Sequence, residues 1–316
     1  MSRSRFNRRH TLLGLGLGLA LAMPGAGALA RSPKVTVKDA SGEVSVPLKP
    51  KTVLVYDLSA LDIIQSLGGD VQGVPNVVTM PKFLGQYADA AKYPQVGSLF
   101  EPDYEKVKSL KPDLIISGGR TQPKLEELRK YAPVLDISIG DGNQMPQVFR
   151  NIRAIAAAYG VPEKGELEIR NIEQEIANVK TKATGKGSML FVMTNGGKMS
   201  VYGPGSRFDM LYSTFGATPV KDKIEVSKHG QAVSFEYLLK TNPDWLLVLD
   251  RDAAIGREGA SAEKLLDNKL VHATKAWRNK QVVYLNATNW YVLSNAGPTA
   301  IKENLKQLSD AFAPAM

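Results

Sequence analysis

Two arginines, Arg120 and Arg251, each follow an apolar run that has the character of a buried strand. Guanidinium groups stay charged at every relevant pH and donate several directed hydrogen bonds, so they suit oxygen-rich anions. These residue types therefore point to the binding of an anion rather than to bond breaking. Two ordinary surface arginines are the alternative interpretation.

Both arginines lie at the same place in a pattern that occurs twice. In each copy a glutamate precedes a proline by seven residues, and an arginine follows that proline by eight: Glu105, Pro112 and Arg120, then Glu236, Pro243 and Arg251. Each copy predicts a short helix, a Pro-Asp turn and a buried strand. In open α/β sheets ligands bind outside the carboxyl ends of the strands. We therefore expect the two arginines to face one shared ligand, one from each half of the chain.

Short β-branched runs alternate with helical stretches on both sides of a long charged segment, which indicates α/β units. The expected elements of the first half are a hairpin of 35–37 with 44–46, strands at 52–56, 113–117 and 134–137, and helices at 59–67, from about 123, and at 144–159. The alternation resumes with a strand at 189–194.

Between these halves, 163–182 carries a narrow apolar stripe among many charges, formed by Leu167, Ile169, Ile172, Ile176 and Val179. This pattern predicts one long, largely exposed helix that acts as a stiff spacer. The expected fold is α/β, with two Rossmann-like lobes joined by a single long helix and a ligand cleft between the lobes. The expected segments are 31–161 for the first lobe, 162–184 for the helix and 185–316 for the second lobe.

The first 30 residues have the features of a secretory signal peptide. Four arginines stand at the start, an apolar run extends from Leu12 to Met23, and Ala28-Leu29-Ala30 offers a cleavage site after Ala30. The run is shorter than the roughly 20 residues that span a bilayer. Arg8-Arg9 leaves twin-arginine export open beside the general secretory route.

Composition narrows the function classes further. The absence of cysteine excludes disulfides, thiolate metal sites and a lipid-modified cysteine, so we expect the mature chain to be free in a periplasm. Without the four leader arginines, 36 of the 40 basic residues remain against 31 acidic ones, a net charge of +5. Basic residues are spread along the chain, so no nucleic-acid footprint is present. We expect a monomer without an intrinsic cofactor.

With these motifs in place, the chain resembles the periplasmic substrate-binding proteins of iron–siderophore and cobalamin importers. The resemblance covers essentially the whole mature chain, and within the family it is strongest to binders of catecholate-type ferric siderophores. It implies two α/β lobes joined by one helix, an Fe(III)–siderophore ligand, and delivery to an inner-membrane ABC permease dimer with its ATPase. A heme or cobalamin carrier on the same fold remains the alternative.

The resemblance also implies a set of site residues. Arg207, in a Gly-Pro-Gly turn before a helix, joins Arg120 and Arg251 as the third cationic contact, and His229 and Tyr291 are implied as iron ligands when the siderophore leaves coordination positions open. Aromatic faces pack on catechol rings, and the chain offers Tyr56, Phe100, Tyr202 and Trp290 for this contact. The two motif glutamates, Glu105 and Glu236, are implied to dock on arginines of the permease.

Two other classes fit the sequence poorly. A site for a bare divalent metal usually gathers several imidazoles and carboxylates, and after the leader only His229 and His272 remain. An enzyme would need a nucleophile–base set, and none of the common motifs is present. Asp57 and Asp62 follow an expected strand without such partners, so we expect no catalysis.

Overall fold

The computed structural model describes residues 33–294 and 296–313. The expected signal peptide and its cleavage site after Ala30 lie outside these residues. Within the described ranges, no helix combines the length and the apolar character needed to cross a membrane.

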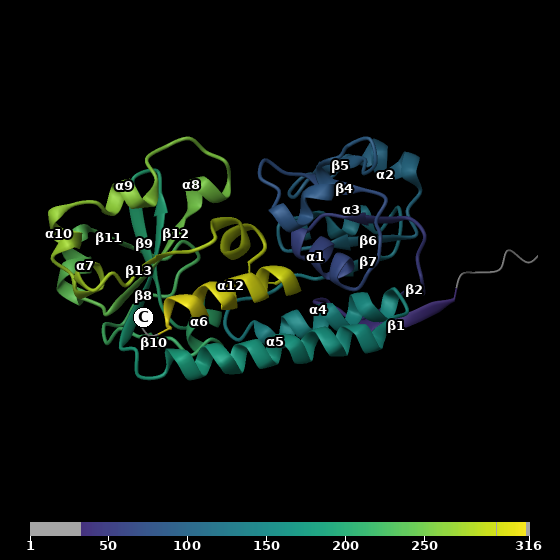
Figure 1. The fold of residues 1–316 in the computed structure, drawn as a ribbon. Coiled ribbons are helices and arrows are strands. Elements are labelled where there is room, and N and C mark those ends of the chain that lie inside the picture. The colour runs from purple at the N-terminus through teal and green to yellow at the C-terminus, as the bar shows by residue number, and fades with distance from the viewer. Residues whose placement is uncertain (1–32, 295, 314–316) are drawn as a thin grey trace, which may run out of the picture. The chain divides into compact units, whose positions relative to one another are not determined.

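The first lobe is built on a small parallel sheet in the order β3-β6-β7, and helices lie around it (Figure 1). Beside this sheet, β1 and β2 pair antiparallel as the expected hairpin, and β4 pairs parallel with β5. The strands are β1 Lys34–Lys38, β2 Glu43–Pro47, β3 Val53–Val55, β4 Val74–Asn76, β5 Gln95–Ser98, β6 Leu114–Ser117 and β7 Val134–Asp136. The helices are α1 Leu58–Ser66, η1 Lys82–Ala88, α2 Tyr104–Leu110, η2 Gln122–Lys124, α3 Leu125–Leu128 and α4 Met145–Ala158.

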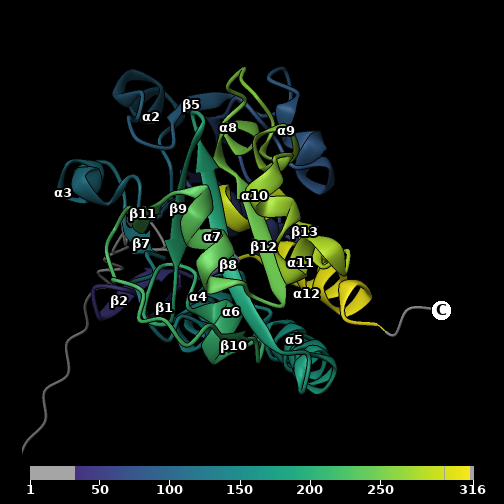
Figure 2. The ribbon, with the colours of Figure 1, turned by 90° about the vertical axis from the view of Figure 1, so that its left-hand side faces the viewer.

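The second lobe holds a six-stranded sheet in the order β11-β9-β8-β12-β13, with β10 paired to β8. Figure 2 shows β8 and β12 side by side in this sheet, where they run parallel over six residue pairs. The strands are β8 Ser188–Asn195, β9 Lys198–Tyr202, β10 Thr218–Pro219, β11 Gln231–Val233, β12 Trp245–Asp250 and β13 Val282–Tyr284. The helices are α6 Met210–Ser213, α7 Phe235–Thr241, α8 Arg251–Ala254, α9 Ala262–Leu266, α10 Lys269–His272, α11 Lys275–Arg278, η3 Thr288–Val292 and α12 Pro298–Ala311.

The two copies of the sequence repeat fold in the same way. Helices α2 and α7 both end at a residue in the left-handed region, Lys111 with φ 48° and Asn242 with φ 44°. The aspartate of each Pro-Asp turn then holds the chain at the start of the neighbouring strand. Asp113 accepts from the backbone N–H groups of residues 51 and 52, and Asp244 accepts from the N–H of Ser188 at 2.8 Å. The buried strands β6 and β12 follow.

Between the lobes, α5 spans Pro162–Ala183 as one helix of 22 residues. It packs against α4 from the first lobe and against α12 from the second (Figure 1). The helix therefore does more than separate the lobes, because α4 and α12 pack against its apolar stripe. Leu167 departs from the expected stripe, since 51% of this residue remains exposed.

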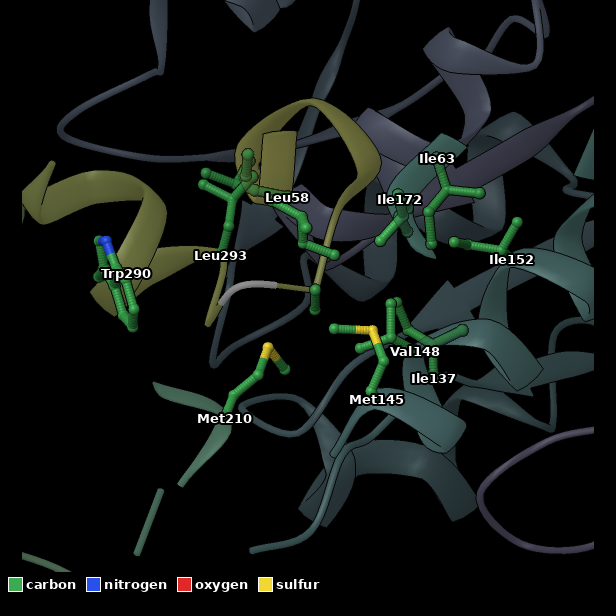
Figure 3. Close-up of a cluster of buried hydrophobic side chains, with 14 of the residues drawn as sticks. Leu58, Ile63, Ile137, Met145, Val148, Ile152, Ile172, Met210, Trp290 and Leu293 are labelled. Atoms are coloured by element: carbon green, nitrogen blue, oxygen red, sulfur yellow. The ribbon is translucent and has the colours of Figure 1, made fainter. Parts of the chain in front are cut away.

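One buried hydrophobic cluster extends from the first lobe into the second. It contains Leu58 of α1, Ile152 of α4 and Ile172 of α5, together with Met210 and Leu293 of the second lobe (Figure 3). A shared core of this kind resists relative motion, because opening it would expose apolar surface to water. The structure confirms the α/β class with two lobes, while the expected helix near residue 123 is only a short turn of η2 and α3.

Candidate functional site

Tyr291 is the centre of the site. It lies in η3, a π-helical turn over Thr288–Val292, and such turns occur frequently at functional sites. Arg251 donates from Nε to the Tyr291 hydroxyl at 2.7 Å. The guanidinium carbons of Arg207 and Arg251 lie 4.8 Å and 5.4 Å from the centre of the tyrosine ring, within cation–π range. Two of the three predicted arginines therefore meet on one phenol.

Arg120 reaches the same turn from the first lobe. Its Nη1 donates to the carbonyl of Val292 at 2.8 Å, and its Nη2 donates to the carbonyl of Tyr291 at 2.9 Å. These partners are about 170 residues away in the sequence, so only the folded chain brings them together. All three arginines thus converge on residues 291 and 292.

Local structure explains where each arginine stands. Arg120 follows β6 through Gly118, where a Cβ atom would lie only 2.0 Å from a carboxylate oxygen of Asp57, so the chain passes close to this acid. Arg251 opens α8, whose N-cap is Asp250. Arg207 lies in the turn before α6, which Asp209 closes by accepting from the N–H of Gly205 at 2.6 Å.

The positive charge of the site is not neutralised by paired acids. Among the described residues, none of the three arginines forms a salt bridge with a carboxylate. Burial lowers the pKa of Arg120, the charge of Asp57 opposes this effect, and the charge of Arg207 adds to it. Burying a cation without an acid to pair with it is costly, so an anionic ligand would stabilise the buried charge of Arg120.

The same charges act on the phenol of Tyr291. Burial by itself raises its pKa, but the hydrogen bond from Arg251 and the charges of Arg251, Arg207 and Arg120 lower the pKa below its ordinary value. A phenol of lowered pKa releases its proton more readily to a metal ion. The geometry therefore equips Tyr291 for the iron-ligand role that the resemblance implied, and this role stays a prediction.

His229 is exposed and lies in the loop that follows Val226. The Ser227 hydroxyl donates to the Gly230 carbonyl at 2.9 Å, and the Gly230 backbone lies against the ring of Tyr202. The loop thus packs on Tyr202 of its own lobe, the second, which also carries Arg207. Among the described residues, no hydrogen bond or ring contact joins His229 to Tyr291, and the role of His229 as an iron ligand stays a prediction as well.

The aromatic residues need a correction. Tyr56 and Trp290 are fully buried and Tyr202 is 1% exposed, so their ring faces are covered by protein. Tyr56 donates to the carbonyl of Val96, and Trp290 packs against Phe191 and Phe215 in the core. The expectation that these three rings stack on a ligand does not fit this arrangement. Of the four, only Phe100 is open to solvent, with 61% of the residue exposed.

Glu105 and Glu236 occupy equivalent places in the two lobes. Each is the second residue of its helix, α2 or α7, and each is exposed. The Ser234 side chain and the Glu236 backbone donate hydrogen bonds that lower the pKa of Glu236. Both positions are accessible, and docking on a permease stays a prediction.

Two polar residues support the arginines; sequence reasoning missed Asn195 and gave Asp57 no role in the site. Asn195 accepts from Nη1 of Arg251 at 2.9 Å, and Asp57 is the acid whose charge acts on Arg120. Asn195 ends β8 beside β12, so the rule that led to Arg120 and Arg251 also applied to it. Asp57 follows β3, whereas Arg120 follows β6. No pattern in the sequence indicated that these two residues lie close together.

These observations define a class: a two-lobed α/β protein whose candidate binding site is a group of arginines contributed by both lobes. Residues 53–288 match the family model described as periplasmic binding protein. The chain therefore belongs to the periplasmic binding protein family. Across the described residues no cluster of three or more His, Cys, Asp or Glu side chains could hold a bare metal ion.

Three proteins that are similar to this chain have names that refer to siderophores. The petrobactin-binding protein YclQ of Bacillus subtilis is 37% identical over 292 residues, which is 90% of each chain. Its crystal structure matches with a TM-score of 0.85 over 90% of this chain and 100% of that chain, at 36% identity. The ferric-anguibactin-binding protein FatB of Vibrio anguillarum is 27% identical, over 85% of this chain and 84% of its own. The catecholate-siderophore-binding protein VctP of Vibrio cholerae matches with a TM-score of 0.79 and 30% identity, over 87% and 99%.

Proposed function

We propose that this protein captures an anionic, catecholate-type Fe(III)–siderophore in the periplasm and delivers it to an ABC importer. The observation that carries this proposal is the convergence of Arg120, Arg207 and Arg251, from both lobes, on the turn of Tyr291. A ferric tris-catecholate carries a formal charge of −3, and three guanidinium groups match that charge with directed donors. YclQ is named for petrobactin, FatB for ferric anguibactin and VctP for catecholate siderophores, and these names support a siderophore as the ligand.

The lobes and the shared core determine how such a ligand is held. Arg120 comes from β6, whereas Arg207 and Arg251 come from the second lobe, so a ligand at Tyr291 would contact both lobes at once. Because the hydrophobic cluster joins the lobes, we expect a largely pre-formed site and little domain movement on binding. Pre-organisation of this kind reduces the free-energy cost of binding.

Tyr291 and His229 would act on iron directly. A siderophore with six donor oxygens fills the coordination sphere, whereas one with four leaves two positions open. The Tyr291 phenolate and the His229 imidazole are the two donors we assign to those positions.

We further propose that the protein is exported by its first 30 residues, works as a monomer, and docks on a permease dimer with its ATPase through Glu105 and Glu236.

A titration of tryptophan fluorescence with four ligands tests this function. The purified mature protein is titrated with a ferric catecholate, a ferric hydroxamate, heme and cobalamin under the same conditions. Binding of the ferric catecholate at least ten times tighter than that of the other three supports the proposal. Tighter binding of heme or cobalamin would overturn it in favour of the other carriers of this fold.

A further inference from the structure

Asp62 is a buried carboxylate that takes no part in the site as described so far. It lies in α1 of the first lobe and is fully buried. Its two oxygens accept from the backbone N–H of Thr299 at 3.2 Å and of Ala300 at 3.0 Å. These groups belong to the first turn of α12, more than 230 residues further along the chain. Asp62 therefore caps a helix that is remote in sequence.

Helix α12 has no cap of its own. Its N-cap residue is Gly297, which has no side chain, and Pro298 follows as the first helical residue. A Cβ atom at Gly297 would lie 2.2 Å from a carboxylate oxygen of Asp62. The backbone at Gly297 has φ −99°, which any residue can adopt, so the glycine is required by this close contact and not by backbone strain.

The chain is held at two points, at residues 291 and 292 and at the first turn of α12. Arg120 holds the carbonyls of residues 291 and 292, and Asp62 holds the N–H groups of residues 299 and 300. Between these points, Leu293 packs in the same buried cluster as Leu58 of α1 (Figure 3). Ser294 adopts φ 52°, a strained conformation for a residue other than glycine that persists only where the surroundings impose it.

The contacts made by Arg120 and by Asp62 are both linked to helix α1 of the first lobe. Asp57, the N-cap of α1, is the acid whose charge acts on Arg120, and Asp62 lies five residues later in the same helix. Burying a carboxylate is costly, and burial raises the pKa of Asp62 to about 6 although the hydrogen bonds from Thr299 and Ala300 lower it. An apolar residue at this position would avoid that cost but would leave the N–H groups of Thr299 and Ala300 without this acceptor.

We infer that Asp62 is a positioning residue: by capping α12 it fixes the start of that helix and so helps to hold Tyr291 in place among the three arginines. Its consequence for ligand affinity rests on the proposed function, whereas its effect on the segment does not. Asp62 does not touch the ligand in this scheme. It acts through the backbone of α12 and of the segment that leads to Tyr291.

Two variants test the contact from its two sides. Asp62→Asn removes the charge and one acceptor, and Gly297→Ala leaves Asp62 intact but introduces the clashing methyl group. Asn268→Ala is the matched control, because Asn268 caps α10 by accepting two backbone N–H groups, from Leu270 and Val271, both at 3.1 Å. If Asp62→Asn fails to fold, Gly297→Ala still tests the proposal.

Each variant is measured in three ways: thermal melting, hydrogen exchange of the segment 288–301 by mass spectrometry, and binding of ferric tris-catecholate prepared from iron(III) and catechol. We expect faster exchange in 288–301 and about fivefold weaker binding for Asp62→Asn and Gly297→Ala, a factor typical of a lost helix cap. Asn268→Ala should lower the melting temperature yet leave exchange in 288–301 and binding unchanged.

Unchanged exchange in 288–301 for both variants would overturn the inference. So would faster exchange accompanied by full affinity, because the position of the segment would then not matter for binding. If the wild-type protein binds no ferric catecholate, the proposed function fails, and the exchange data alone still decide whether Asp62 fixes the segment.

Discussion

At the scale of single residues, the three arginines differ in how many of their N–H donors already have an acceptor in the protein. Arg120 donates to two carbonyls and Arg251 donates to Tyr291 and Asn195. Arg207, by contrast, lies within cation–π range of the rings of Phe208 and Tyr291, and no hydrogen bond from its guanidinium is present within the described part of the chain. Arg207 is therefore the arginine with the most donors available for a ligand.

Replacing the arginines tests the role of charge. Each Arg→Ala substitution at 120, 207 and 251 should weaken binding of a ferric catecholate about tenfold or more, because a hydrogen bond to a charged group contributes about 1.5–3 kcal/mol. Arg207→Ala should cause the largest loss. Fluorescence titration measures the effect, and a neutral ferric trihydroxamate serves as the control ligand. Equal affinity of the wild-type protein for both complexes would contradict the charge argument.

The iron ligands make a separate prediction. With a bis-catecholate that supplies four oxygens, Tyr291→Phe and His229→Ala should each alter the charge-transfer absorption of the bound complex. With a siderophore that supplies six, the same variants should change the spectrum far less. Tyr291→Phe is informative because it keeps the ring beside Arg207 and removes only the hydroxyl. An unchanged four-donor spectrum in both variants would show that neither residue binds iron.

At the scale of elements, the residues that stabilise the repeated Pro-Asp turns are different from the residues proposed to bind the ligand. Asp113 and Asp244 hold the amino ends of neighbouring strands, whereas Arg120 and Arg251 follow the carboxyl ends of β6 and β12. The two functions lie at opposite ends of the same strands. A change at one end should therefore leave the other largely unaffected.

We expect Asp113→Ala and Asp244→Ala each to lower the free energy of unfolding by about 1–3 kcal/mol, the cost of leaving backbone donors without partners. Hydrogen bonds from Ser188 lower the pKa of Asp244, and burial opposes them. The stabilisation by this carboxylate is therefore present above its ordinary pKa of 3.8 and is lost as the pH falls through its lower folded value. Chemical denaturation at neutral and acidic pH measures both effects. A marked loss of ligand affinity in either variant would contradict the separation.

At the scale of the whole molecule, the two lobes present one exposed glutamate each at equivalent helix starts. Acidic residues are favoured there by the helix dipole, and this alone would account for Glu105 and Glu236. Two equivalent anions on a pseudo-symmetric carrier also suit a two-fold symmetric permease. Surface ion pairs are worth about 0–1 kcal/mol, so we expect them to orient docking more than to tighten it.

The double variant Glu105→Arg with Glu236→Arg should abolish iron–siderophore uptake and leave ligand affinity intact, because reversed charges add repulsion to the loss of the pairs. Uptake in cells that lack the wild-type gene measures the first effect, and fluorescence titration measures the second. Glu126 and Glu163, which are also exposed, provide a control pair for charge reversal. Normal uptake by the double variant would place docking on another surface.

The sequence by itself determined the α/β class, the long helix between two halves, and the repeat that marks Arg120 and Arg251. These features follow from periodicity and turn chemistry, which act over a few residues and so are visible in a single chain. The same local rules predicted the hairpin of β1 and β2 and the strand at β8 nearly to the residue. Arg207, His229 and Tyr291 came from family resemblance.

Only the tertiary structure decided which side chains are inside and which remote segments meet. Tyr56, Tyr202 and Trp290 have ring types that suit a ligand, yet packing places them in the core. Arg120 and Asp62 find their partners some 170 and 240 residues away. No local pattern encodes such contacts, because burial and long-range pairing depend on how the lobes and α12 pack against one another.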